Sequence, residues 1–318
     1  MNGFRLTNLC MVSPAAFGYN AETAATNRFQ RAPEPDAAAA AALSAQRAAL
    51  REFEGAVSAL RAGGLAVCVA QDTALPPKPD AIFPNNWVSF HEDGTVVLYP
   101  MRDPSRRLER NEALIERVKR ELGFIERRRL DLSGEEKQGR FLEGTGSLVL
   151  DRAAKVAWAC RSPRTDEALV REWARQMDYE PVIFDACSPD GTPVYHTNVL
   201  LWVGARAAGC GFDWIDAAQR EHIAARLRAG GGSGGRRCVL ALDTQALLGF
   251  AGNMLDINRG DMSLLAASHT AWTSLTIAQQ TQLRDAGCTP VLADIPTIEA
   301  LGGGSLRCML AEVPAPAQ

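Results

Sequence analysis

Several features that would place a protein in a familiar class are missing from this chain of 318 residues. Its eight cysteines include no C-x-x-C pair, which argues against a zinc ribbon, a redox dithiol and a disulfide framework. No G-x-G-x-x-G motif follows the first expected strand, so the dinucleotide-binding signature is absent. The cysteines and the four histidines are scattered and form no ligand cluster, and we therefore expect neither a metal nor an organic cofactor.

Charge and hydropathy argue against two further classes of partner. Lysine and arginine number 34 against 37 aspartates and glutamates, so the chain lacks the basic footprint of a nucleic-acid-binding protein. No segment approaches the roughly 18 apolar residues that span a bilayer, and the N-terminus has no signal-peptide pattern. We expect a cytoplasmic protein that binds a small molecule and neither nucleic acid nor a membrane. Its oligomeric state, a homo-oligomer included, is left open.

Apolar strands and amphipathic helices alternate along the chain in a repeating order. The first expected helix, over residues 36–63, has apolar side chains at spacings of three, four and seven. We distinguish five strand–helix–strand units, and a final strand over residues 306–313 is left over to close the array onto the first strand. The other strands are expected at residues 5–13, 65–70, 81–90, 95–99, 147–150, 156–160, 182–184, 198–203, 238–242, 247–257, 262–267 and 290–295, and the other helices at 103–122, 165–177, 215–229 and 275–286.

Recurring units of this kind indicate a solenoid or a closed, propeller-like array. The alternative is a doubly wound parallel sheet, because alternating strands and helices are typical of that fold too. Against it, several units carry two adjacent strands before the helix. The glycine-rich residues 230–235 lack the Lys-Ser/Thr of a phosphate-binding loop and are expected to form a surface loop. We expect residues 1–318 to form a single α/β domain.

The first candidate for chemistry is Cys308, which follows three consecutive glycines near the C-terminus. Residues 299–313 read Glu-Ala-Leu-Gly-Gly-Gly-Ser-Leu-Arg-Cys-Met-Leu-Ala-Glu-Val. Glycine permits positive φ and a close approach of a ligand, so a thiol at this junction can lie at the mouth of a cleft. The alternative is a buried cysteine that acts as a small hydrophobic side chain.

His196 and Glu143 are candidates for an acid–base group and a carboxylate. His196 opens residues 195–203, Tyr-His-Thr-Asn-Val-Leu-Leu-Trp-Val, at the expected start of a strand, and a hydrogen-bonded structural histidine is the alternative. Glu143 lies in residues 141–150, Phe-Leu-Glu-Gly-Thr-Gly-Ser-Leu-Val-Leu, where a charge is costly unless it is paired. No sequence spacing links these residues to Cys308.

A third candidate segment is residues 80–87, Asp-Ala-Ile-Phe-Pro-Asn-Asn-Trp. Asp80 stands beside an apolar stretch, and the consecutive Asn85 and Asn86 oppose the β-propensity of their surroundings. Two amides in such a place fit the polar lining of a pocket, although an ordinary asparagine turn is the alternative.

These segments together resemble the guanidine-modifying, or pentein, superfamily. The resemblance is carried by residues 80–87, by Leu-Glu-Gly-Thr-Gly at 142–146, His-Thr-Asn at 196–198, Phe-Ala-Gly-Asn-Met at 250–254 and Gly-Gly-Ser-Leu-Arg-Cys-Met at 303–309. It covers nearly the whole chain in a consistent order, and it is strongest with the amidinotransferase-like citrulline utilisation hydrolases. The superfamily also includes arginine deiminase and dimethylarginine dimethylaminohydrolase. The fold it implies, a five-fold pseudosymmetric α/β propeller, agrees with the five units.

The resemblance also implies roles for residues of this chain. Cys308 matches the family's nucleophile, His196 its catalytic histidine and Glu143 its carboxylate. Arg164 resembles an arginine that holds the substrate α-carboxylate, and Arg106 lies in another similar stretch. The implied substrate-binding residues are Asp80, Phe83, Asn85, Asn86, Arg106, Arg164, Asn198 and Asn253.

Departures from the family pattern bear on the substrate. Asn85 and Asn86 stand where relatives have Glu-Asp, and Asn198 stands where arginine deiminases have Asp. Carboxylates would pair with a guanidinium cation, whereas amides suit a neutral group. We therefore favour hydrolysis of citrulline to ornithine. The alternatives are an amidinotransferase, an arginine deiminase or dimethylarginine hydrolase, and, from another class, a non-catalytic binding protein of the same fold.

Overall fold

The computed structural model describes residues 7–32, 38–230, 237–259 and 262–315. Within these ranges, fifteen strands pair into five three-stranded sheets. In each sheet two strands are antiparallel, and the third pairs in parallel with the middle strand after a helical crossover. The chain therefore has the five-fold α/β propeller fold that the sequence predicts.

Each unit consists of an antiparallel strand pair, a crossover helix and a parallel strand. The first unit comprises β15 (Ala311–Pro314), β1 (Thr7–Ser13), α2 (Ala38–Ala62) and β2 (Val67–Gln71), and the second comprises β3 (Val88–Phe90), β4 (Thr95–Leu98), α3 (Pro104–Arg107), α4 (Glu112–Leu122) and β5 (Arg128–Asp131). The third comprises β6 (Leu148–Asp151), β7 (Val156–Cys160), α6 (Glu167–Met177) and β8 (Glu180–Phe184), and the fourth comprises β9 (Leu201–Val203), β10 (Ala207–Cys210), α7 (Ala217–Ala229) and β11 (Cys238–Ala241). The fifth comprises β12 (Leu255–Arg259), β13 (Met262–Ser268), α10 (Ile277–Asp285) and β14 (Cys288–Ala293).

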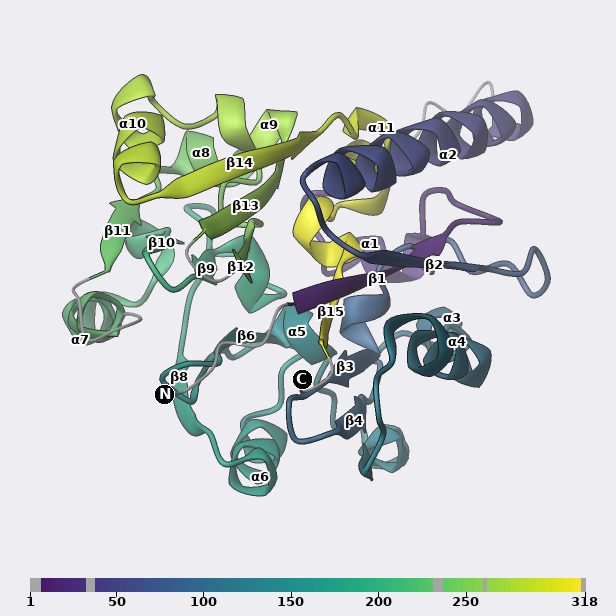
Figure 1. Cartoon of the computed structure of the whole chain (residues 1–318), viewed down its shortest axis with the longest axis horizontal. Coiled ribbons are helices and arrows are strands. Elements are labelled where there is room, and N and C mark those ends of the chain that lie inside the picture. Colours follow the sequence, from purple (N-terminus) through teal and green to yellow (C-terminus); the bar gives the residue numbers. More distant parts are fainter. Residues whose placement is uncertain (1–6, 33–37, 231–236, 260–261, 316–318) are drawn as a thin grey trace.

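The last strand closes the ring onto the first, as the sequence predicts. β15 pairs antiparallel with β1, with Thr7 opposite Pro314 and Cys10 opposite Ala311. The crossover helices α2, α4, α6, α7 and α10 lie around the outside, and the sheets face the centre (Figure 1). None of the helices within the described ranges is long and apolar enough to cross a membrane.

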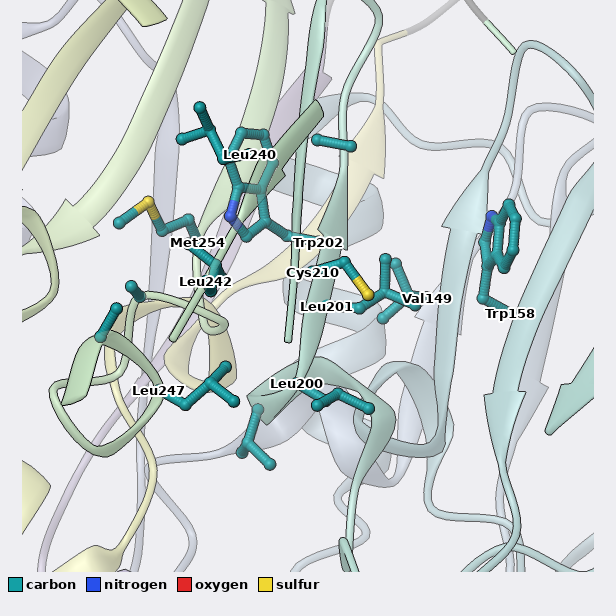
Figure 2. Close-up of a cluster of buried hydrophobic side chains, with 14 of the residues drawn as sticks. Val149, Trp158, Leu200, Leu201, Trp202, Cys210, Leu240, Leu242, Leu247 and Met254 are labelled. Carbon is teal, nitrogen blue, oxygen red and sulfur yellow. The ribbon is translucent and has the colours of Figure 1, made fainter. Parts of the chain in front are cut away.

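Apolar side chains fill the spaces between neighbouring units. Figure 2 shows Trp202 and Cys210 of the fourth unit beside Leu240, Leu242 and other buried side chains. Trp202 is 2% exposed and Cys210 is fully buried, so the sheets are held by packing on faces that water does not reach.

Several expected strands begin later than the sequence predicts. A short helical turn precedes the first strand: η2 (Pro84–Asn86) before β3, η4 (Thr197–Val199) before β9 and η7 (Leu306–Met309) before β15. Ser147 likewise belongs to α5 (Gly144–Ser147), and the expected strand at 247–257 divides into the end of α8 (Thr244–Leu248), a turn and β12. The predictions were wrong there because the buried residues of these turns, mostly polar at η2 and η4, continue directly into the apolar strands.

Other boundaries also differ from the prediction. The expected helix at 103–122 divides into α3 and α4 because the side chain of Asn111 caps a new helix by accepting from the amide of Ala113. Leu108, expected on its buried face, is 52% exposed. Asp166, not Thr165, caps α6. Strands β5 and β10 were not predicted, and residues 231–235 of the glycine-rich run lie outside the described residues.

Candidate active site

The candidate residues come from equivalent places in the five units. Each precedes the first strand of its unit: Cys308 in η7, Asn86 in η2, Glu143 directly before α5, His196 directly before η4 and Asn253 two residues before β12. Because the units are arranged around one centre, these turns meet there. The pseudosymmetry thus brings together residues that no sequence spacing connects.

Cys308 lies at the end of a turn that requires glycine. Gly303 ends α11 (Pro296–Gly302) with φ +63°, and a Cβ on Gly304 would approach the ring of Phe83 to 3.1 Å. The thiol is 3% exposed and lines a pocket, as expected from the sequence. Burial raises the pKa of the Cys308 thiol, and the amide of Asn253 opposes that rise.

His196 and Glu143 form a buried pair, with 2.8 Å between Nε2 and Oε2. Burial lowers the pKa of His196 to about 4, although the bond to Glu143 acts in the opposite direction. Burial alone would raise the pKa of Glu143, but Arg164 and the contact with His196 hold it well below its usual range. At neutral pH the pair is therefore a carboxylate and a neutral imidazole that the carboxylate can stabilise once it is protonated.

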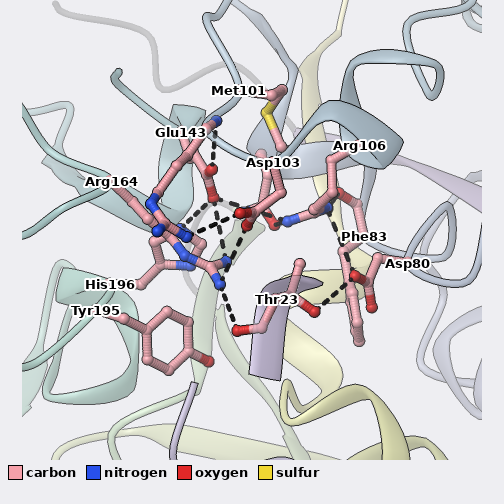
Figure 3. A network of polar contacts seen from close by, with 12 residues as sticks. Thr23, Asp80, Phe83, Met101, Asp103, Arg106, Glu143, Arg164, Tyr195 and His196 are labelled. Carbon is pink, nitrogen blue, oxygen red and sulfur yellow. Dashed lines mark hydrogen bonds and ion pairs between the residues drawn. The ribbon is translucent and has the colours of Figure 1, made fainter. Parts of the chain in front are cut away.

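Two buried arginines lie beside this pair (Figure 3). Arg106 donates to both carboxylate oxygens of Glu109 at 2.9 Å, and its Nη1 donates to Oδ1 of Asn86 at 2.8 Å. Arg164 Nη1 lies 3.4 Å from Oε2 of Glu143. Arg106 is also 3.8 Å from that oxygen, so both cations act on the same carboxylate.

A segment near the N-terminus, residues 15–32, covers the pocket and includes α1 (Ala21–Ala24). Asn20 Nδ2 donates to Asp80 at 2.8 Å, and Thr23 Oγ1 donates to the same carboxylate oxygen at 3.1 Å. Arg164 donates to the carbonyl oxygen of Thr23 at 2.9 Å and to Oγ1 of Thr26 at 2.7 Å. We call residues 15–32 the covering segment. The sequence indicated only a polar loop there.

Some polar atoms of the site have no protein partner. Among the described residues, Asp80 Oδ1, Asn85 Oδ1 and Asn86 Nδ2 are buried and make no hydrogen bond. Because Arg106 holds the carbonyl oxygen of Asn86, the amide NH₂ group is the end left free. A Cβ on Gly146 would lie 2.5 Å from Asn86 Nδ2 and 2.7 Å from His196 Nδ1, so both nitrogens converge over this glycine.

The structure brings most of the predicted site residues together and places four behind the others. Asn85 donates to Oγ1 of Thr145 at 3.2 Å, and Asn198 and Asn253 contact the sulfur of Cys308. Glu143 lies behind His196. The predicted residues that line the pocket are Asp80, Phe83, Asn86, Arg106, Arg164, His196 and Cys308.

Sequence reasoning missed several residues of the site. Tyr195 donates from its hydroxyl to the carbonyl of Gly303 at 2.7 Å, and the guanidinium of Arg164 lies 5.2 Å from its ring centroid. Its position directly before His196 was the available signal. Asp103 occupies the N-cap position of α3, but its side chain makes no capping hydrogen bond and instead binds Arg102 at 2.8 Å. Thr23, Asn27 and Glu109 were not predicted either.

The described residues contain no group of three or more histidine, cysteine, aspartate or glutamate side chains that could hold a metal ion. The space between the pocket residues amounts to about 270 Å³, open solvent included. A buried thiol, an imidazole–carboxylate pair and two arginines in such a pocket can perform nucleophilic chemistry on a small polar substrate.

The fold and this constellation place the chain in the pentein class of guanidine-modifying proteins. The cyanobacterial arginine dihydrolase ArgZ shares the fold with 16% identity and a TM-score of 0.73, over 98% of this chain and 41% of the full ArgZ chain. The match covers 99% of the separate N-terminal domain of ArgZ. Dimethylarginine dimethylaminohydrolase (DDAH) from Pseudomonas aeruginosa, described in complex with citrulline, has 13% identity and a TM-score of 0.64, over 97% of this chain and 100% of that one.

The family itself is identified by the sequence model for N,N dimethylarginine dimethylhydrolase, eukaryotic, which matches residues 13–315. The chain belongs to this family, and it is therefore a hydrolase of carbon–nitrogen bonds. No curated protein sequence matches it significantly. The family membership removes the alternative of a non-catalytic binding protein.

Proposed function

We propose that the chain hydrolyses a C–N bond in the ureido or guanidino group of an arginine-related amino acid, through a covalent intermediate on Cys308. The observation that carries the proposal is the convergence of the Cys308 thiol with the buried His196–Glu143 pair at one small pocket. The favoured substrate is citrulline, with ornithine as the product.

Proton transfer in this scheme begins from a neutral thiol and a neutral imidazole. The thiol proton passes to His196, and the imidazolium that forms is stabilised by Glu143 at 2.8 Å. The thiolate attacks the trigonal carbon, and His196 then gives its proton to the departing amine. Water attacks the carbon held on sulfur while His196 accepts the water proton, the carbon–sulfur bond breaks to release carbamate, and the proton on His196 returns to the sulfur to restore the thiol.

The free polar atoms support the choice of an amino acid with a neutral end group. Asp80 Oδ1 can accept from an α-ammonium group, and the arginines supply positive charge for an α-carboxylate. At the reacting end, the free NH₂ group of Asn86 can donate to a ureido oxygen. A guanidinium group has no oxygen to accept this bond, so the amide favours citrulline over arginine.

The covalent step can be tested directly. Protein mixed with citrulline and quenched in acid should show, by mass spectrometry, an added carbonyl-containing fragment on the peptide that contains Cys308. A steady-state reaction that turns over without any such adduct, even when sampled within the first turnover, would contradict the covalent scheme.

An amidinotransferase remains the main alternative on the same site. It would pass the carbon group to an amine such as glycine, whereas the proposed hydrolase passes it to water. Product analysis with and without added acceptor amines distinguishes the two, and the proposal predicts that added amines leave the product unchanged.

The wider setting belongs to the same proposal. We propose that residues 1–318 act as one domain and that the protein works in the cytoplasm, where the eight free cysteines would stay reduced. The proposed partner is a small amino acid.

A further inference from the structure

The sulfur of Cys308 is flanked by two side-chain amides that lie behind it. Nδ2 of Asn253 is 3.2 Å from the sulfur, and Nδ2 of Asn198 is 3.5 Å from it. Both asparagines are buried, at 0% and 1% exposure. Neither lines the pocket, so the amides meet the sulfur on the side away from the substrate.

The orientation of the Asn253 amide is fixed by a second contact. The same Nδ2 donates to the backbone carbonyl of Asn198 at 2.8 Å. Turning the amide over would place its oxygen against that carbonyl oxygen, which is unfavourable. An NH₂ group has two hydrogens, so one serves the carbonyl and the other faces the sulfur.

The backbone before Asn253 is shaped to allow this contact. A Cβ on Gly252 would lie 2.1 Å from the carbonyl oxygen of Val199, so only glycine permits the approach of the two turns. Phe250 has φ +65°, a left-handed conformation that is strained for a residue other than glycine. Strained conformations of this kind are typical of functional sites.

These amides can stabilise the thiolate form of Cys308. Burial favours the neutral thiol, whereas an N–H donated to sulfur favours the thiolate. A neutral ureido substrate brings no positive charge to stabilise the thiolate, so the protein has to supply that stabilisation. Arg307 adds a favourable field, smaller than the effect of Asn253 and larger than that of Asn198, while its guanidinium is engaged by the carbonyl of Leu310 and by Glu312.

We propose that Asn253, assisted by Asn198, is a positioning residue that stabilises and aims the thiolate of Cys308, and that it makes no contact with the substrate. This inference rests on the proposed role of Cys308 as the nucleophile. It gives Asn253 and Asn198 a different task from the substrate binding expected from the sequence.

The test measures the ionisation of Cys308 without any substrate. Thiolate absorbance in the ultraviolet and the rate of iodoacetamide labelling of the Cys308 peptide are followed against pH in Asn253→Leu and Asn253→Ala. We expect the pKa of the thiol to rise by about one unit, which means about tenfold slower labelling at neutral pH. In turnover assays kcat should fall while KM changes little.

Asn85→Leu and Asn85→Ala are the matched controls, because Asn85 is equally buried in the corresponding turn of another unit and does not touch the sulfur. They should leave the pKa of Cys308 unchanged. Unchanged thiol ionisation in both Asn253 variants, with a raised KM, would overturn the inference.

Leucine has the same branched outline as asparagine without its polar atoms, and circular dichroism confirms folding. If neither Asn253 variant folds, Asn198→Ala gives the same readout with a smaller expected rise, and no rise there overturns the inference. A raised pKa of the Cys308 thiol in the Asn253 variants would support the inference. If the unaltered protein nevertheless turned over no ureido or guanidino compound, the proposed function would be contradicted and the inference would stand.

Discussion

At the scale of single residues, Cys308 lies between a pocket in front and two amides behind. Cys308 and its two main partners, Glu143 and His196, could be predicted from the sequence because each stands in an unusual local context: a thiol after glycines, a carboxylate among apolar residues and a histidine at a strand start. The contacts of Arg164 could not be predicted. They join residues more than a hundred positions apart, Thr23 and Thr26, and no local pattern marks such a contact.

The thiol provides the simplest prediction at this scale. Cys308→Ser should fold normally and lose at least about 10³-fold in kcat, because a serine hydroxyl is a far weaker nucleophile at neutral pH. Cys187→Ser is the matched control, since Cys187 is an exposed free cysteine, and it should retain full turnover. Undiminished turnover in a folded Cys308→Ser protein would remove the nucleophile from the account.

Glu143→Gln should change the pH dependence of kcat as well as its size. The reactive state needs His196 neutral in the resting protein, so activity should fall as pH drops through the low pKa of His196, about 4. Removing the carboxylate removes the contact that raises this pKa, and the acidic limb should move to lower pH while kcat drops about 10²-fold. A limb that moves to higher pH would contradict the assigned geometry.

At the scale of elements, the units were predictable and their internal boundaries were not. The apolar stripe of α2 and the alternating apolar residues of β7 are strong signals. β5 was missed because three of its four residues, Arg128, Arg129 and Asp131, are charged and exposed, and β10 because Ala-Ala-Gly-Cys lacks β-branched side chains. The turns before the first strands are buried like the strands that follow them, so an expectation of burial cannot mark where each strand begins.

The glycine turn before Cys308 gives a prediction about one such element. Gly303→Ala places a Cβ at φ +63° and 2.6 Å from Nδ2 of Asn27, so it should destabilise the fold by roughly 2–3 kcal/mol and reduce kcat. Gly191→Ala is the control, because Gly191 has φ +82° with open space around it.

The control should cost only about 1 kcal/mol, from backbone strain, and leave kcat unchanged. Urea unfolding and steady-state kinetics of both variants measure these effects. Equal losses of unfolding free energy in the two variants would show that the close contact with the covering segment does not contribute to stability.

At the scale of the whole molecule, a ring of five units brings turns that are far apart in the sequence together in one site. The element order indicated a solenoid or a closed array, with a doubly wound sheet as the alternative, and the resemblance to the pentein superfamily selected the ring. The covering segment was the part of the molecule that could not be predicted, since its polar residues acquire a role only after the ring has formed. Asp80 and Arg164, from different units, both bind it.

Global stability should depend on pH through a buried histidine away from the site. His91 is 4% exposed and bonds Ser89 at 2.8 Å, and burial holds its pKa well below the usual value, with Arg152 and Lys155 adding to the effect. The folded pKa is below the unfolded one, so this stability is present above about pH 6.5 and is lost as pH falls.

Between pH 7.5 and pH 5 the loss should be about 2 kcal/mol in the free energy of unfolding. In His91→Gln that part of the pH dependence should disappear, whereas His222→Gln, at an exposed helix position, should keep it. Urea unfolding at both pH values provides the comparison, and an unchanged pH dependence in His91→Gln would contradict the assigned burial of a neutral imidazole.

The most direct test of the central claim is the ratio of kcat/KM for citrulline to that for arginine, measured on the purified protein with Cys308→Ser as the blank. The amide of Asn86 in place of a carboxylate, with its NH₂ group free, predicts a ratio above one and ornithine as the product. Faster turnover of arginine or dimethylarginine than of citrulline would contradict the account of the site.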